Sequence, residues 1–237
     1  MAKDRQGEDR TVRRHAGLVR LTHWINALVL LFLLMSGLQI LRAHPALYWG
    51  DVATFADPWA AFGEIPGWLT IPSFRDLADG RRWHFFFAWA LVFNGAVYLV
   101  WGLTRGHLRR DLLPTAEELK PRSLWRDVVE HARLRFPKGE AALRYNPLQK
   151  LTYLAVIFGL LPLMLATGLS MSPGMNAAWP WLPELFGGRQ SARTFHFLSA
   201  SALVAFVAVH LAMVVASGPI NNLRGMITGR VHLETER

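Results

Sequence analysis

The chain of 237 residues contains no cysteine. Without thiol groups it has no disulfide, no thiolate metal site, no iron–sulfur cluster and no haem attached covalently through a Cys-x-x-Cys-His motif. Any metal or cofactor must therefore be held by histidine, carboxylate or backbone groups.

Charged residues are also scarce, at 18% of the chain against 52% hydrophobic residues, whereas an ordinary soluble domain has about 25% charged residues. Aspartate, glutamate, lysine and arginine are absent altogether from four stretches, residues 21–41, 83–104, 151–183 and 194–223. A helix needs about 20 apolar residues to cross a bilayer. The sequence therefore predicts an integral membrane protein with four transmembrane helices, the first of which is too long for a cleaved signal peptide.

The basic residues are distributed unevenly between the connections. Twenty of the 26 Lys and Arg residues lie in 1–20, 104–150 and 217–237, and only six lie in 42–82 and 172–193. Because cytoplasmic segments carry the excess of Lys and Arg, both termini and the 104–150 loop are predicted to be cytoplasmic. The net charge of +9 is thus attributed to topology and to contact with anionic lipid, not to binding of nucleic acid.

The expected fold is an all-α bundle of four transmembrane helices, joined by loops and flanked by a polar tail at each end. A basic and mobile tail at 1–17 precedes a four-helix domain at 18–217, and a second cytoplasmic tail follows at 218–237. The helices are predicted at about 18–41, 83–103, 148–171 and 194–217, with a kink at Pro162 in the third. Residues 123–136 form an amphipathic pattern typical of a helix on the inner membrane surface.

Four of the nine histidines, His23, His84, His196 and His210, lie in the apolar spans, where an ionisable side chain is costly and indicates a functional role. His196 and His210 are fourteen residues apart, which is about 21 Å and close to four helical turns, so both lie on one face of a helix. The predicted topology places His84 and His196 at an outer level and His23 and His210 at an inner level. Two levels with two imidazoles each favour two six-coordinate haems, since zinc would gather three or four ligands in one cluster.

Two glycines have a matching register. Gly37 follows His23 by fourteen residues and Gly95 follows His84 by eleven, so each shares the face of its histidine at the other level. A missing side chain there leaves room for a flat macrocycle. Close packing of helices through small residues is the alternative explanation.

Four arginines are candidate partners of the anionic haem propionates. Arg20 lies one turn before His23, Arg193 lies one turn before His196, and Arg81 and Arg82 precede His84. Ordinary positive flanking of an inner helix end explains Arg20 nearly as well. The outer arginines are more informative, because positive flanking predicts few of them on that side.

Several of these segments resemble one family. The sequence Arg20-Leu21-Thr22-His23-Trp24, the run ending in Ser36-Gly37, the Thr167-Gly168 pair and the four histidines are similar to cytochrome b561-type membrane subunits. These include the cytochrome b subunits of nickel hydrogenases, formate dehydrogenases and thiosulfate reductases. The resemblance covers residues 18–230, and the 146–150 and 167–171 segments look most like the thiosulfate-reductase branch. The tryptophan-rich outer loop is longer than in minimal members.

The resemblance implies a four-helix bundle in the bacterial inner membrane with two haem b groups. Such a protein is an electron-transfer subunit of an oxidoreductase complex, to which no catalytic residues are assigned, and it connects a periplasmic oxidoreductase to membrane quinone. In the thiosulfate-reductase branch that partner is often a molybdopterin enzyme. The quinone is expected beside the inner haem, where Asn26, about one turn from His23, is a candidate hydrogen-bond donor unless it serves only in helix packing.

Two other functions remain open from the sequence. A stand-alone oxidase of a small reductant such as superoxide would also use quinone as acceptor, with Arg81, Arg82, Arg189 and Arg193 as a basic outer patch. A transporter or channel without redox chemistry would use the buried histidines as proton relays. A Soret band in the purified protein distinguishes the redox functions from the transporter.

The outer connections are rich in tryptophan, at Trp49, Trp59, Trp68, Trp179 and Trp181. Aromatic residues are enriched in the cores of protein interfaces, so these loops are predicted to dock the periplasmic partner. An aromatic belt at the membrane surface is the alternative.

Overall fold

The computed structural model describes residues 10–137 and 139–233. Four of its helical segments are long and apolar enough to cross a membrane, Gly17–Ala43, Leu77–Thr104, Gly139–Met171 and Arg189–Ala216. The predicted all-α membrane fold with four spans is therefore confirmed. The chain forms two compact units, one from the described parts of 1–23, 97–155 and 207–237, the other from 24–96 and 156–206.

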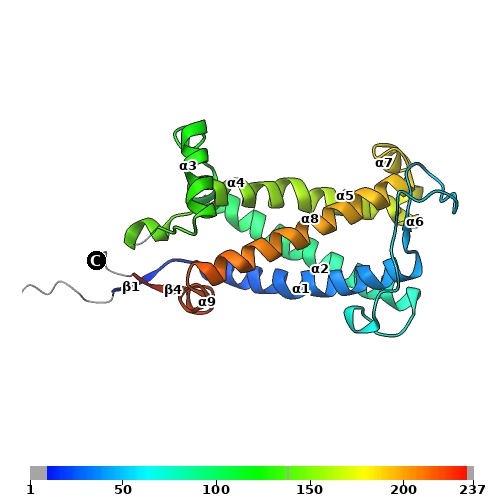
Figure 1. The fold of residues 1–237 in the computed structure, drawn as a ribbon, viewed down its shortest axis with the longest axis horizontal. Helices are drawn as coiled ribbons and strands as arrows, with labels where there is room; N and C mark the ends of the chain where they lie inside the picture. The colour runs from blue at the N-terminus through cyan, green and yellow to red at the C-terminus, as the bar shows by residue number, and fades with distance from the viewer. Residues whose placement is uncertain (1–9, 138, 234–237) are drawn as a thin grey trace, which may run out of the picture. The chain divides into compact units, whose positions relative to one another are not determined.

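The elements follow one another along the chain with short connections outside the outer loop (Figure 1). In order they are β1 (Arg10–Arg13), α1 (Gly17–Ala43), β2 (Ala46–Leu47), β3 (Ala60–Ala61), η1 (Gly67–Leu69), α2 (Leu77–Thr104), η2 (Leu108–Leu112), α3 (Pro121–Ala132), η3 (Gly139–Leu143), α4 (Pro147–Ala155), η4 (Val156–Leu160), α5 (Leu161–Met171), α6 (Pro173–Ala178), α7 (Trp181–Glu184), α8 (Arg189–Ala216), α9 (Pro219–Thr228) and β4 (Arg230–Leu233).

In the first unit the first and the last described strands pair with each other. Strand β1 pairs antiparallel with β4, so that Val12 lies opposite Val231 (Figure 1). The Val231 side chain is buried and lies against Gly225, where an added Cβ would come within 2.9 Å of it. The expectation of a mobile tail is therefore wrong for Arg10–Arg13, because backbone pairing with a strand more than 200 residues away fixes it. No local sequence pattern reveals such a pairing.

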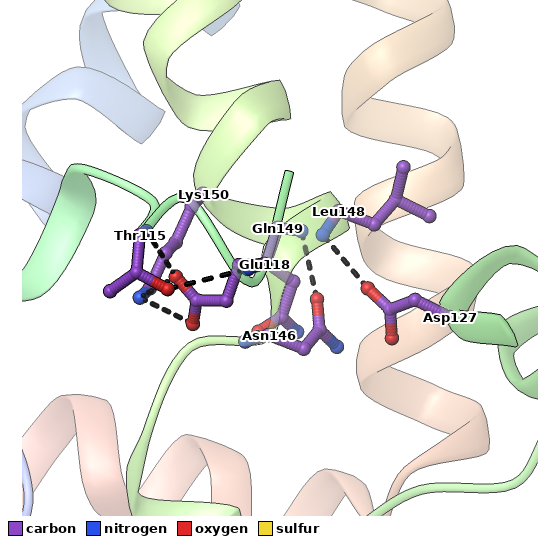
Figure 2. A network of polar contacts seen from close by, with 7 residues as sticks. All are labelled: Thr115, Glu118, Asp127, Asn146, Leu148, Gln149 and Lys150. Atoms are coloured by element: carbon purple, nitrogen blue, oxygen red, sulfur yellow. Dashed lines mark hydrogen bonds and ion pairs between the residues drawn. The ribbon is translucent and has the colours of Figure 1, made fainter. Parts of the chain in front are cut away.

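The third span begins at α4 with a network of polar contacts (Figure 2). Asn146 caps the helix, since its Oδ1 accepts a hydrogen bond from Gln149 N at 2.8 Å while Gln149 Oε1 accepts from Asn146 N at 3.3 Å. The buried Asp127 carboxylate of α3 accepts a further bond from Leu148 N at 2.8 Å. These contacts satisfy amide groups that a helix start leaves without an intrahelical partner.

Lys150 lies buried in the same network (Figure 2), and its Nζ donates to both carboxylate oxygens of Glu118 at 2.8 and 3.0 Å. Burial alone would raise the pKa of Glu118, but the hydrogen bonds from Lys150 and Thr115, together with the Lys150 charge, hold that pKa below its usual value. The lowered pKa favours the charged form of Glu118, and its contact with Lys150 joins the connection after η2 to α4.

In the second unit, α2 begins at Leu77 rather than near residue 83. The Asp76 carboxylate caps the helix by accepting from Asp79 N at 2.9 Å. Hydropathy indicates only the apolar part of a helix, whereas a capped helix continues into polar sequence. For the same reason α8 begins at Arg189, five residues before the charge-free stretch.

The third span departs from regular α-helix close to Pro162, the residue at which the sequence predicts a kink. A π-helical segment, Val156–Leu160, joins α4 to α5, whose second residue is Pro162. Proline lacks the N–H that would close the regular i to i−4 bond, and a π-bulge is one way in which a helix accommodates such a break.

The connection between α1 and α2, residues 44–76, which the sequence predicts to be the outer loop, is packed against the start of α8. Thr194 Oγ1 accepts from Trp59 Nε1 at 3.2 Å and donates to Tyr48 O at 2.8 Å. The Trp49 ring stacks on Trp59 with centroids 5.8 Å apart and meets Phe195 at 5.5 Å. Trp49 and Trp59 therefore have a structural role in addition to any contact with a partner.

Candidate functional site

The second unit brings His84 of α2 and His196 of α8 together, with ring centroids 6.1 Å apart. Each ring is held by a hydroxyl on a neighbouring helix. His84 Nδ1 lies 3.0 Å from Ser36 Oγ on α1, and His196 Nδ1 lies 3.0 Å from Thr167 Oγ1 on α5. The structure thus brings the two rings close together in an edge-on arrangement, at an interplanar angle of 65°, and their role as a ligand pair stays a prediction.

The hydroxyls determine which ring nitrogen is protonated. Ser36 Oγ donates to Phe32 O at 2.7 Å and Thr167 Oγ1 donates to Leu163 O at 2.7 Å, so each oxygen accepts a bond from the histidine. His196 Nδ1 also lies 3.1 Å from Met164 O, which only accepts. Both rings therefore carry their proton on Nδ1 and present a neutral Nε2, which is the form that ligates a metal.

A glycine follows each hydroxyl residue and lies against the same ring. A Cβ on Gly37 would lie 3.5 Å from His84 Cε1, and one on Gly168 would lie 3.4 Å from His196 Cε1. A larger side chain at either position would displace the imidazole. Sequence reasoning noticed Gly37 for its register with His23, but it missed this contact with His84.

The first unit contains a second pair, His23 of α1 and His210 of α8, with ring centroids 6.3 Å apart. Arg20 lies beside it in sequence, and its guanidinium Nη1 donates to Ile227 O of α9. An added Cβ on Gly229 would come within 3.3 Å of Arg20 Nε and Cζ. The guanidinium is therefore positioned by the turn between α9 and β4.

The spacing of both pairs fits one metal ion held between two imidazoles. A bond from imidazole nitrogen to a transition metal is about 2 Å long and the ring centre lies roughly 1 Å behind that nitrogen, so two rings on opposite sides of one ion have centroids about 6 Å apart. The observed 6.1 and 6.3 Å match this value. Within residues 10–137 and 139–233, no three His, Asp or Glu side chains gather as a cluster for one metal ion, so the donor set suits two axial ligands of a haem rather than tetrahedral zinc.

The remaining predicted residues have partners within the protein. Arg193 donates to Ala46 O at 3.1 Å and to His44 O, and Arg82 forms an ion pair with Asp79 at 2.6 Å. The Arg81 guanidinium lies 5.8 Å from the centre of the Phe85 ring. The structure thus does not bring the outer arginines together as one free basic patch.

Asn26 and Gly95 lie in the second unit. Asn26 Oδ1 accepts a hydrogen bond from Asn94 Nδ2 at 2.7 Å, which joins α1 to α2. A Cβ on Gly95 would meet no heavy atom of the described residues within 4 Å. Gly95 therefore has no close contact that explains it by helix packing, whereas Asn26 has a packing partner.

His15 lies near the inner pair, in the first unit. Burial is the largest cause that lowers its pKa from 6.5 to about 4, and the charges of Arg14, His23, Arg20 and His107 contribute to the same shift. The folded protein therefore holds His15 neutral at pH 7, whereas the unfolded chain protonates it near pH 6.5.

Acidification is expected to destabilise the protein through His15. Between about pH 6.5 and 4 the unfolded chain binds a proton that folded His15 resists, so the stability that His15 contributes is full above pH 6.5 and is lost as the pH falls to about 4. A His15→Gln variant should show a weaker pH dependence of its thermal midpoint in detergent. Identical pH profiles for the variant and the original protein would contradict this prediction.

Comparison with known proteins identifies the family. Residues 14–229 match the family described as prokaryotic cytochrome b561. The chain belongs to that family. It is 32% identical over 84% of its length to the putative protein-methionine-sulfoxide reductase subunit YedZ1 of Azospira oryzae, of which 89% is covered. It is also 25% identical over 81% of its length to the probable Ni/Fe-hydrogenase B-type cytochrome subunit of Cupriavidus necator, of which 74% is covered.

This cytochrome b561 protein is accordingly a membrane b-type cytochrome that takes part in electron transfer and binds haem b. The hypothesis of a transporter without redox chemistry is therefore set aside. Ser36 and Thr167 are residues of the candidate site to which the sequence analysis assigned no role. The signal was present as a hydroxyl residue directly before glycine in two different spans, but their contacts with His84 and His196 depend on the packing of four helices.

Proposed function

We propose that this cytochrome carries two haem b groups and transfers electrons between membrane quinone and a periplasmic oxidoreductase. The observation that carries the proposal is the presence of two histidine pairs, each with ring centroids about 6 Å apart and each in its own compact unit. His84 and His196 would hold one haem, and His23 and His210 the other.

A bound haem supplies reversible one-electron chemistry, and the protein tunes it. The Ser36 and Thr167 hydroxyls hold the two outer imidazoles in the orientation and tautomer that ligation requires. Arg20, whose guanidinium also donates to Ile227 O, is proposed to neutralise anionic haem groups beside the inner pair, whereas the Arg193 guanidinium is already bonded to Ala46 O and His44 O. Gly37 and Gly95 are proposed to admit the flat ring of the cofactor close to the backbone.

The partner is proposed from the two relatives. One is named as a subunit of a methionine-sulfoxide reductase and the other as a hydrogenase cytochrome, so both names specify an oxidoreductase complex. Because the relative with the higher identity is named as a reductase subunit, we propose that the partner of this protein is a reductase. A reductase consumes electrons, so electrons would flow outward from quinol to the partner. By the family resemblance we propose a molybdopterin enzyme in the periplasm, with the inner membrane as the location of the complex.

The outer tryptophans divide into two groups with respect to docking. Trp49 and Trp59 pack on α8 and are still 50% and 44% exposed, while Trp68 and Trp181 are exposed to 76% and 54%. We propose that Trp68 and Trp181, the more exposed pair, contact the partner. A stand-alone oxidase of superoxide is less well supported, because Arg82 and Arg193 are already bound to Asp79 and to the outer loop.

The purified protein tests this function directly. Spectra of the dithionite-reduced protein and a haem assay should give two b haems per chain, and a quinol should reduce them in proteoliposomes. With quinone reacting near the inner pair, turnover with an external redox partner should generate a membrane potential. One haem per chain would overturn the dihaem proposal, and turnover without a membrane potential would place quinone on the outer side.

A further inference from the structure

Helix α3 turns Asp127 and His131 toward the protein and exposes both apolar and charged side chains on its other sides. Asp127 is only 7% exposed, and His131 lies half-buried on the same face one turn later. Among the apolar side chains, Trp125 is 69% exposed and Val128 is 40% exposed. A tryptophan and a valine exposed side by side on a helix are unfavourable in water, so this stripe suits an apolar environment.

The polar face is fixed to α4 by specific contacts in the first unit. Asp127 Oδ2 accepts from Leu148 N at 2.8 Å. His131 Nδ1 donates to Asp127 O at 2.8 Å, which leaves His131 Nε2 to accept from Asn146 Nδ2 at 3.1 Å. Figure 1 shows α3 lying across the direction of α4 rather than along it. This orientation is the one expected of an amphipathic helix on the membrane surface beside a spanning helix.

A row of arginines borders the apolar stripe. Arg122, Arg126 and Arg133 are spaced by four and seven residues and share one side of α3. All three are exposed. Trp125, Val128 and Ala132 are spaced by three and four residues and form the adjacent stripe. Apolar side chains beside a single line of guanidinium groups match the acyl region and the phosphate layer of an anionic bilayer.

We propose that α3 is a docking surface for the anionic lipid of the cytoplasmic leaflet. Trp125 and Val128 enter the acyl boundary, and Arg122, Arg126 and Arg133 contact lipid phosphates. Charge complementarity favours this occupant, because the loop that contains α3 belongs to the basic segments predicted to face the anionic leaflet. The contacts of Asp127 and Asn146 then couple bound lipid to the start of the third span.

Because the chain contains no cysteine, a single introduced cysteine is the only site that a thiol-reactive label can modify. We would place a nitroxide at Val128→Cys in the haem-loaded protein, reconstituted with phosphatidylcholine alone or with added phosphatidylglycerol. The label is expected to be accessible to oxygen and shielded from a water-soluble nickel chelate, more strongly with phosphatidylglycerol. A label at Glu130→Cys, on the exposed polar side of α3, is the matched control and should stay accessible to the chelate.

The charge is tested separately. A triple variant that combines Arg122→Gln, Arg126→Gln and Arg133→Gln should abolish the effect of phosphatidylglycerol. Each arginine is expected to contribute about a fivefold preference of α3 for the anionic bilayer. The corresponding triple lysine variant, which keeps the charge, should retain the effect. A Val128 label that remains water-accessible in both lipids overturns the proposal, as does shielding that appears only when a soluble protein is added. If the Val128 label is shielded equally in both lipids and the triple glutamine variant changes nothing, α3 does not select anionic lipid, and that part of the proposal is overturned. Haem spectra of every variant verify the fold, and they distinguish failure here from failure of the proposed redox function.

Discussion

His196→Ala is expected to lower the haem content from two per chain to one and to leave the spectrum of the other haem intact. The His196 ring is the facing partner of His84 at 6.1 Å, and an axial ligand cannot be replaced by a methyl group. The His23 and His210 pair belongs to the other compact unit, so its haem should stay in place.

The His196 prediction is measured by haem assay and by low-temperature spectra that resolve the two haems. His44→Ala is the matched control, because His44 is an exposed histidine in the outer loop, and its contribution to Arg193 is a backbone carbonyl. The control should keep both haems. Retention of two haems in His196→Ala would refute the ligand assignment, while His210→Ala should give the reciprocal spectrum.

Gly168→Leu is expected to displace the His196 ring and to weaken binding of the outer haem by one to two orders of magnitude. A Cβ at this position would already lie 3.4 Å from His196 Cε1, so the further carbons of leucine overlap the imidazole. Overpacking of this kind costs about 1–3 kcal/mol. Gly168→Ala adds only the Cβ, at an ordinary contact distance, and its effect should be small.

Gly159→Leu is the matched control for Gly168, because Gly159 lies in the same span and an added Cβ there would meet no heavy atom of the described chain within 4 Å. Haem content and the thermal midpoint of each variant should be compared in the same detergent. If Gly168→Leu and Gly159→Leu lose haem equally, the glycine contact with His196 has no part in the site.

Much of the site was predictable because a membrane restricts what a sequence can do. A charge-free stretch of sufficient length must be a spanning helix, since backbone groups in lipid have no other partner. Histidine within such a stretch is costly, and helical periodicity relates His196 to His210 along one helix. These rules are local, and they gave the four spans and the two histidine pairs.

The contacts between helices were not predictable in the same way. The apolar stretches are hydrophobic all round, so they do not specify which side of a helix faces its neighbours. The hydroxyls of Ser36 and Thr167 reach His84 and His196 across sequence separations of 48 and 29 residues. The same holds for Arg193, whose carbonyl partners in the outer loop are almost 150 residues away.

The sequence by itself determined the membrane class, the four spans and the candidate axial ligands, because burial in lipid penalises charge wherever it occurs in the chain. Only the tertiary structure decided the pairing of β1 with β4, the inward-facing Asp127 of α3 and the glycine contacts at His84 and His196. Each of these depends on residues far apart in sequence, and hydrogen bonds and close contacts of that kind are selected by packing rather than by local propensity.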